Sequence, residues 1–101
     1  MQDGFIKVAA ATPEIKVADC AFNAASTISI MKQAEGLGVR LLVLPELGLT
    51  GYTCGDLFLQ PVLLEGARDA LDCVRRASQK MDMLAIVGLP AAFRGKVYNC
   101  A

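Results

Sequence analysis

Glu46 is the side chain whose position most directly indicates chemistry. It lies in the stretch LLVLPELGLTGY, two positions after aliphatic residues 41–44, which are typical of a buried strand. A negative charge at the end of a buried strand costs free energy unless it reaches water or serves a reaction. Open α/β sheets bind their ligands at the carboxyl ends of strands. Glu46 is therefore a candidate general base; the alternative is a loop carboxylate that points to solvent or caps backbone amides.

Three leucines near Glu46 lead us to expect a dry environment for its carboxylate. Leu44, Leu47 and Leu49 enclose it in sequence, and removal of water disfavours the charged form of a carboxylate. That effect suits a group that takes and returns a proton near neutral pH.

Composition excludes several classes of function. Histidine is absent, so these residues hold no Cys-His dyad, no Ser-His-Asp triad and no His-ligated zinc. The ten acidic and ten basic residues balance and form no block, which argues against a nucleic-acid or membrane surface.

The apolar run at residues 83–93 contains Gly88 and Pro90 and is shorter than the ~20 residues of a spanning helix. Asp3 and Lys7 interrupt the first residues, which do not resemble an export signal, and the four cysteines lack metal-ligand spacing, so we expect reduced thiols and a cytoplasmic location.

The glycines do not form a phosphate-binding loop. The pair Gly36-x-Gly38 precedes a strand, whereas phosphate loops lead from a strand into a helix. Gly48, Gly51 and Gly55 follow a strand but match neither nucleotide-binding spacing. They are better explained as residues that let a loop fold tightly over a site.

The sequence predicts alternating strands and helices in the order β-α-β-α-β-β. We expect strands at residues 5–11, 39–44 and 84–89, the last stopped by Pro90, and a further strand beginning near Val97 after a turn around Gly95. We expect one helix from an N-cap at Asp19 to about residue 37, and a second beginning at residues 60–61. This order indicates an α/β fold with parallel strands.

Each predicted helix has one apolar stripe that we expect to face the sheet. The stripes are Phe22, Ala25, Ile28, Met31 and Ala34 in the first helix, and Leu64, Ala67, Leu71, Val74, Ser78 and Met81 in the second. The strands read as continuous apolar runs, which is typical of burial on both faces. Because 54% of the residues are apolar, we expect this chain to be part of something larger.

The stretch around Glu46 resembles the glutamate-bearing strand and loop of the nitrilase, or carbon-nitrogen hydrolase, superfamily. IKVAAATP resembles the first strand of that fold, and IVGLP and GKVYNCA resemble the next two. Residues 46–71 are most similar to the glutaminase domain of glutamine-dependent NAD synthetases. The resemblance implies that residues 1–101 are the N-terminal portion of such a domain, within a four-layer αββα sandwich.

That resemblance also implies roles for two residues. The family uses a Glu-Lys-Cys triad, in which Glu46 is the general base for a cysteine nucleophile and the lysine stabilises the oxyanion. By the family's order, both partners lie beyond Ala101. Tyr52 matches a tyrosine that lines the glutamine pocket; the alternative is a loop aromatic that packs on the sheet.

Other reactive side chains do not fill the missing triad roles. Cys54 is out of the family order, so we interpret it as a buried or bystander thiol. We expect Lys80 and Lys96 to be surface residues, and Asn99 and Cys100 to pack in a sheet.

The resemblance implies glutamine hydrolysis that supplies ammonia for NAD synthesis. The resemblance also implies that the partners of this chain are the remainder of the glutaminase domain and a synthetase domain, and that the protein forms a homo-oligomer. ATP and magnesium would belong to the synthetase domain, with no cofactor in this chain. Two alternatives remain: a free-standing nitrilase-type amidase, and a non-catalytic α/β assembly module.

The portion formed by residues 1–101 is expected to be inactive by itself, because it holds one member of a three-residue mechanism. Glutamine is the small-molecule partner that the resemblance implies.

Overall fold

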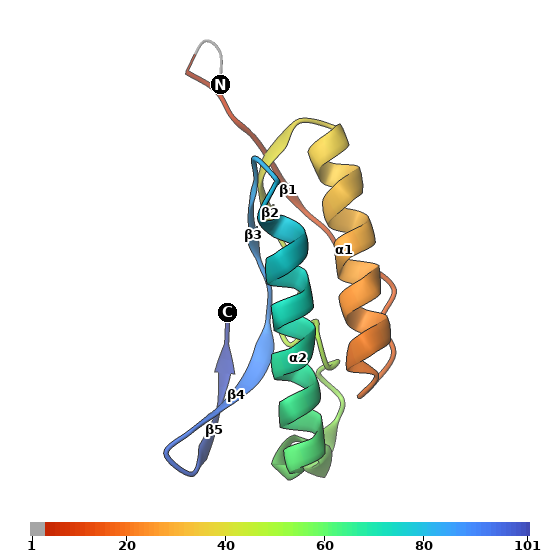
Figure 1. The fold of residues 1–101 in the computed structure, drawn as a ribbon, viewed down its shortest axis with the longest axis vertical. Coiled ribbons are helices and arrows are strands. Elements are labelled where there is room, and N and C mark those ends of the chain that lie inside the picture. Colours follow the sequence, from red (N-terminus) through yellow and green to blue (C-terminus); the bar gives the residue numbers. More distant parts are fainter. Residues whose placement is uncertain (1–3) are drawn as a thin grey trace.

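The structure is a computed structural model that describes residues 4–101 and has a mixed α/β architecture (Figure 1). In chain order the elements are β1 (Lys7–Ala10), α1 (Cys20–Gly36), β2 (Val39–Val43), the 3₁₀ helix η1 (Gly55–Leu59), α2 (Pro61–Ser78), β3 (Leu84–Ile86), β4 (Leu89–Phe93) and β5 (Lys96–Cys100). The predicted α/β class is confirmed, and strands and helices alternate as expected as far as β3.

The three-stranded sheet is parallel, with β2 between β1 and β3. This arrangement confirms the prediction from the strand-helix-strand order. The register places Ala9, Leu42 and Ala85 in one row across the sheet. The next row includes Val43 and Ile86, which point to the opposite face because successive strand residues alternate. Leu42 is fully buried, whereas Val43 and Ile86 are exposed, so only one face of the sheet is covered by described residues.

The two long helices pack side by side against the covered face of the sheet (Figure 1). Asp19 caps α1 as predicted, since its Oδ1 accepts a hydrogen bond from the Phe22 amide at 3.1 Å. Pro61 begins α2, where its missing N–H leaves no helical hydrogen bond unmade. Both predicted helix starts are therefore confirmed.

Small side chains form the contact between α1 and α2, and this shifts the buried faces from the predicted stripes. A Cβ atom added to Gly66 would lie 3.4 Å from Cys20 Sγ, so the helices approach closely at this point. Ala25 was expected inside and is exposed, while the neighbouring Ala24 is buried. The buried residues are Cys20, Asn23, Ala24, Thr27, Met31 and Ala34 in α1, and Leu63, Ala67, Ala70 and Val74 in α2.

The predicted strand at residues 84–89 is wrong in its extent, because the chain forms two strands here in two different sheets. β3 pairs with β2, whereas β4 runs through Pro90 and pairs antiparallel with β5. Proline is tolerated because β4 belongs to a two-stranded hairpin, in which each strand has a free edge. Arg94 and Gly95 both have positive φ, +51° and +77°, which is typical of a tight hairpin turn and confirms the turn predicted around Gly95.

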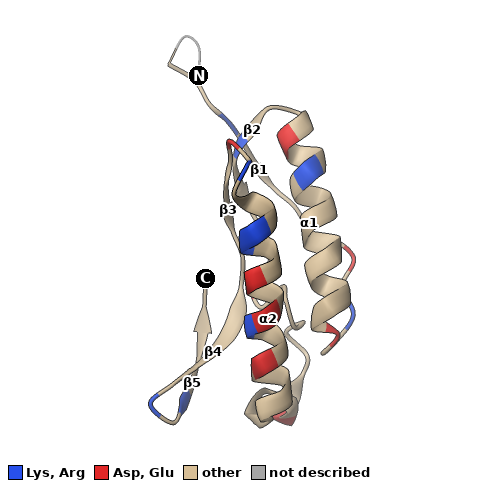
Figure 2. Ribbon diagram, viewed as in Figure 1, with Lys and Arg blue, Asp and Glu red and all other residues tan. Residues whose placement is uncertain are grey.

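The second face of the sheet is apolar. Val8 and Leu84 are 58% and 65% exposed, and charged residues lie mainly on α2 and near the ends of the strands rather than along them (Figure 2). This agrees with the expectation that the strands are suited to burial on both faces. None of the helices within residues 4–101 has the length and apolar character needed to cross a membrane.

Candidate active site

Glu46 lies just beyond β2, at the carboxyl end of the parallel sheet. Sheet hydrogen bonding continues past the strand, because the Leu44 amide donates to the Ile86 carbonyl at 3.0 Å. The chain then turns, and the Gly48 amide donates to the Pro45 carbonyl at 3.1 Å. Glu46 therefore occupies the edge where α/β sheets bind ligands.

The loop that follows Glu46 is held by its own backbone. The Leu47 carbonyl accepts hydrogen bonds from the amides of Thr50 and Gly51, at 3.2 and 2.8 Å. Leu47 has a φ of +51°, a left-handed conformation that costs a non-glycine residue about 1–3 kcal/mol. Gly51 has a φ of +84°, which glycine adopts without that cost. Gly48 and Thr50 are buried, so the backbone beside Glu46 is fixed by internal contacts.

Asn23 of α1 joins the Glu46 loop to the segment that precedes the helix. Its side chain is fully buried, and Nδ2 donates to the Leu49 carbonyl at 3.1 Å and to the Lys16 carbonyl at 2.8 Å. Its Oδ1 accepts from the Lys16 amide at 2.7 Å. A further bond from the Ala18 amide to the Thr50 carbonyl, at 2.7 Å, joins the same two segments. The role of Asn23 was not predicted, because this residue lies outside the apolar stripe expected for the helix and its neighbours in the sequence do not indicate its partners.

We expect Asn23→Ala to lower the free energy of unfolding by about 3 kcal/mol, because it removes three hydrogen bonds of a fully buried side chain and leaves the Leu49 carbonyl without its partner. The measurement is urea unfolding of the full-length protein. Ser29→Ala, at an exposed position of the same helix, is the control and should change stability by less than about 0.5 kcal/mol. Equal stability of the two variants would contradict the role assigned to Asn23.

Gly88, between β3 and β4, lies directly against the backbone of the Glu46 loop. A Cβ atom at this position would lie 2.5 Å from Leu47 N, 2.9 Å from the Pro45 carbonyl oxygen and 3.2 Å from the Glu46 carbonyl carbon. The Gly88 carbonyl also accepts a hydrogen bond from the Leu49 amide at 3.1 Å. A glycine inside an apolar strand pattern often marks such a close backbone approach, and this signal was present in the sequence.

The environment of Glu46 differs from the dry enclosure that we expected. Glu46 is exposed, so Leu44, Leu47 and Leu49 do not enclose its carboxylate within the described residues. Leu44 and Leu49 are instead buried in the core. Asn99 and Cys100 lie in a sheet strand as expected, but the Asn99 side chain is exposed and its Nδ2 donates a hydrogen bond to Glu46 Oε1.

Tyr52 and Cys54 follow in the same loop and have opposite environments. Tyr52 is 72% exposed, so its ring does not pack on the sheet. Cys54 is buried, and its thiol donates to the carbonyls of Thr50 and Gly51 at 3.2 and 3.3 Å. The interpretation of Cys54 as a buried thiol is confirmed.

The remaining reactive groups form no second centre. Burial raises the pKa of the Cys20 thiol, with smaller contributions from Cys54 and Asp19, so this thiol stays protonated and unreactive at neutral pH. Lys80 and Lys96 are exposed, as predicted. Among residues 4–101, no group of three or more His, Cys, Asp or Glu side chains could hold a metal ion.

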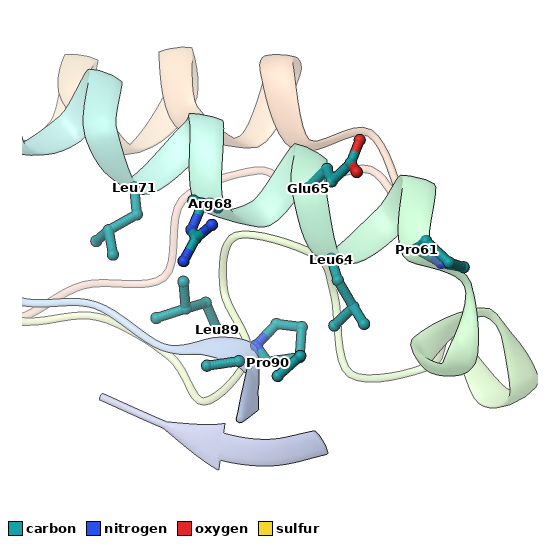
Figure 3. Close-up of a pocket in the computed structure, with 9 residues that line it drawn as sticks. Pro61, Leu64, Glu65, Arg68, Leu71, Leu89 and Pro90 are labelled. Atoms are coloured by element: carbon teal, nitrogen blue, oxygen red, sulfur yellow. The ribbon is translucent and has the colours of Figure 1, made fainter. Parts of the chain in front are cut away.

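A groove of about 430 Å³ lies between α2 and β4. Leu64 and Leu71, which we expected in the buried stripe of α2, point instead toward Leu89 and Pro90 across this groove (Figure 3). Its walls are largely apolar, and neither Glu46 nor Tyr52 lines it. The groove is therefore separate from the candidate active site.

Comparisons with known proteins agree with the resemblance seen in the sequence. The model of a family described as carbon-nitrogen hydrolase matches residues 7–101. The glutamine-dependent NAD(+) synthetase of Mycobacterium leprae is 37% identical over 98 residues, and that of Mycobacterium tuberculosis strain H37Rv is 40% identical over 101 residues. These alignments cover 97% and 99% of this chain but only 14% and 15% of the two relatives.

A solved structure has the same arrangement of elements. The crystal structure of a glutamine-dependent NAD(+) synthetase from Cytophaga hutchinsonii superposes with a TM-score of 0.87 and 30% sequence identity. The match covers 94% of this chain and 16% of that chain. The fold thus corresponds to one segment of a much longer enzyme.

Proposed function

We propose, since this chain belongs to the carbon-nitrogen hydrolase family, that it supplies the catalytic base of a glutamine-hydrolysing domain. The observation that carries this proposal is the position of Glu46. Its carboxylate is accessible and lies at the carboxyl end of a parallel sheet, and the loop that follows it is held in place by internal hydrogen bonds. A general base needs this combination of access and fixed geometry.

In the proposed reaction, Glu46 takes the proton of a cysteine thiol, and the thiolate attacks the amide carbon of glutamine. The C–N bond of the tetrahedral intermediate then breaks, and the proton passes from Glu46 to the departing ammonia. Glu46 next takes a proton from the water molecule that hydrolyses the thioester, which releases glutamate and restores the thiol. The family pattern supplies the cysteine and a lysine that stabilises the oxyanion; both belong to the proposed remainder of the domain.

Tyr52 is the proposed substrate-binding residue in this chain. Its ring is 72% exposed, while the adjacent Gly51 and the nearby Cys54 are buried. An exposed aromatic ring on an anchored loop can contact a small substrate with little loss of conformational entropy.

We further propose that a synthetase domain uses the released ammonia, as the names of the relatives suggest. ATP and magnesium would act in that domain. The residues described here do not fit these groups, because they include no metal-ligating cluster and the loop glycines lack a phosphate-binding spacing.

The apolar face of the sheet would pack against the second sheet of a nitrilase-type sandwich. A homo-oligomer and a cytoplasmic location stay predictions.

Substrate selectivity tests the proposed function against that of a free-standing amidase. In the full-length protein we expect kcat/KM for glutamine to exceed that for asparagine by roughly 10- to 200-fold, the range associated with one methylene group. We also expect ATP-dependent amidation to proceed with glutamine or with added ammonia. Ammonia release from each amide and formation of the amidated product are measured separately. Efficient turnover of simple amides or nitriles without ATP-dependent amidation would favour the amidase.

A further inference from the structure

Asn99 makes the only hydrogen bond to the Glu46 carboxylate within residues 4–101, through Nδ2 to Oε1. We propose that Asn99 is a positioning residue that fixes the orientation of this carboxylate and leaves Oε2 as the oxygen that accepts a proton. The inference rests on the proposed role of Glu46 as general base. It assigns a function to a residue that lies 53 positions further along the chain.

The hairpin of β4 and β5 brings Asn99 to Glu46. Asn99 pairs with Pro90 across the hairpin, and Cys100 pairs with Leu89. Leu89 is buried in the core, so the end of the hairpin where β4 begins has a fixed position relative to the sheet. Figure 1 shows β5 running back along β4 toward the end of β3. The Asn99 side chain therefore extends from an anchored strand and not from a free loop.

The same hairpin also contacts the backbone beside Glu46. Gly88 immediately precedes β4, and its α-carbon faces the Leu47 amide and the Pro45 carbonyl so closely that a Cβ atom would overlap them. One segment thus determines the position of the Glu46 backbone through Gly88 and the orientation of its carboxylate through Asn99. A steric contact at Gly88 and a hydrogen bond from Asn99 thus both position Glu46 relative to the hairpin.

An amide is a suitable donor for this task. An exposed glutamate has three rotatable side-chain bonds, and a hydrogen bond to one oxygen reduces the conformations available to the other. A lysine or arginine in the same place would strongly favour the ionised form of the carboxylate and so weaken it as a base. A neutral amide orients the carboxylate with a smaller effect of this kind.

The test compares Asn99→Ala and Asn99→Asp in the full-length protein. Asn99→Asp keeps the shape of the side chain, removes the donor and places a second negative charge beside Glu46. We expect both variants to lower kcat for glutamine hydrolysis about 10- to 100-fold, the factor associated with one hydrogen bond to a charged group. KM for glutamine, the melting temperature and ammonia-driven amidation should stay near the wild-type values. Lys96→Ala, at an exposed position of the same strand, is the control and should keep wild-type kcat.

Glu46→Gln and the double variant Glu46→Gln/Asn99→Ala complete the test. If Asn99 acts through Glu46, adding Asn99→Ala to Glu46→Gln causes no further loss of glutamine hydrolysis. Wild-type kcat in both Asn99 variants, with Glu46→Gln inactive, would overturn this inference alone. Parallel losses of melting temperature and ammonia-driven amidation would also overturn it, because they indicate a structural role. Full activity of Glu46→Gln would overturn the proposed function and this inference together.

Discussion

Glu46→Gln is expected to abolish glutamine-driven amidation by the full-length protein while leaving ammonia-driven amidation intact. Glutamine has nearly the shape of glutamate, and its side-chain oxygen can still accept the hydrogen bond from Asn99 Nδ2. The substitution therefore removes the proposed base and preserves the fold. Loss of a general base corresponds to a fall of about 10²–10⁴-fold in kcat. The measurement is the rate of product formation with glutamine and, separately, with a saturating ammonium salt.

Glu14→Gln is the matched control for this experiment. Glu14 is also exposed and lies in the segment before α1, so the same change of charge is made away from the candidate site. Both nitrogen sources should support wild-type rates in this variant. If Glu46→Gln also retained its glutamine-driven rate, the non-catalytic assembly module would become the better hypothesis for this chain.

The sequence was sufficient to predict most of the fold because local patterns determine most of its elements. The Asp19 cap and Pro61 mark the starts of the two helices, and both are confirmed. The division between β3 and β4 was not predicted, because residues 84–89 form one continuous apolar run. What divides that run is a change of pairing partner, from β2 to β5, and pairing partners are not encoded in hydropathy.

The position of Glu46 could be predicted, but its surroundings could not. A carboxylate after a buried strand is visible in the sequence, because it depends on neighbouring residues only. Its contact with Asn99 joins residues 53 positions apart. The close approach of Gly88 to Leu47 likewise depends on how two segments meet in space. Such contacts arise from tertiary structure, and a single sequence gave at most the presence of a glycine in an apolar run.

Gly88→Ala is expected to reduce glutamine hydrolysis by displacing the Glu46 loop. The added methyl group would lie 2.5 Å from Leu47 N and 2.9 Å from the Pro45 carbonyl oxygen. These are backbone atoms, so no side-chain rotation can relieve the overlap, and the loop or the hairpin must move. A displacement approaching 1 Å at a catalytic group can lower the rate about 10²-fold, and overpacking of this kind costs about 1–3 kcal/mol of stability. Glutamine-driven and ammonia-driven rates, together with the melting temperature, are the measurements.

Gly36→Ala separates this steric effect from a general effect of losing a glycine. Gly36 ends α1, has no atom within 4 Å of an added Cβ and does not have a positive φ. Alanine at that position should leave both rates unchanged and stabilise the protein by about 0.4–1 kcal/mol. Selective loss of the glutamine-driven rate in Gly88→Ala, with the ammonia-driven rate retained, would indicate that the hairpin positions the catalytic base. Wild-type glutamine turnover in Gly88→Ala would show instead that the loop tolerates the displacement, and that the position of the Glu46 backbone is not set by its contact with Gly88.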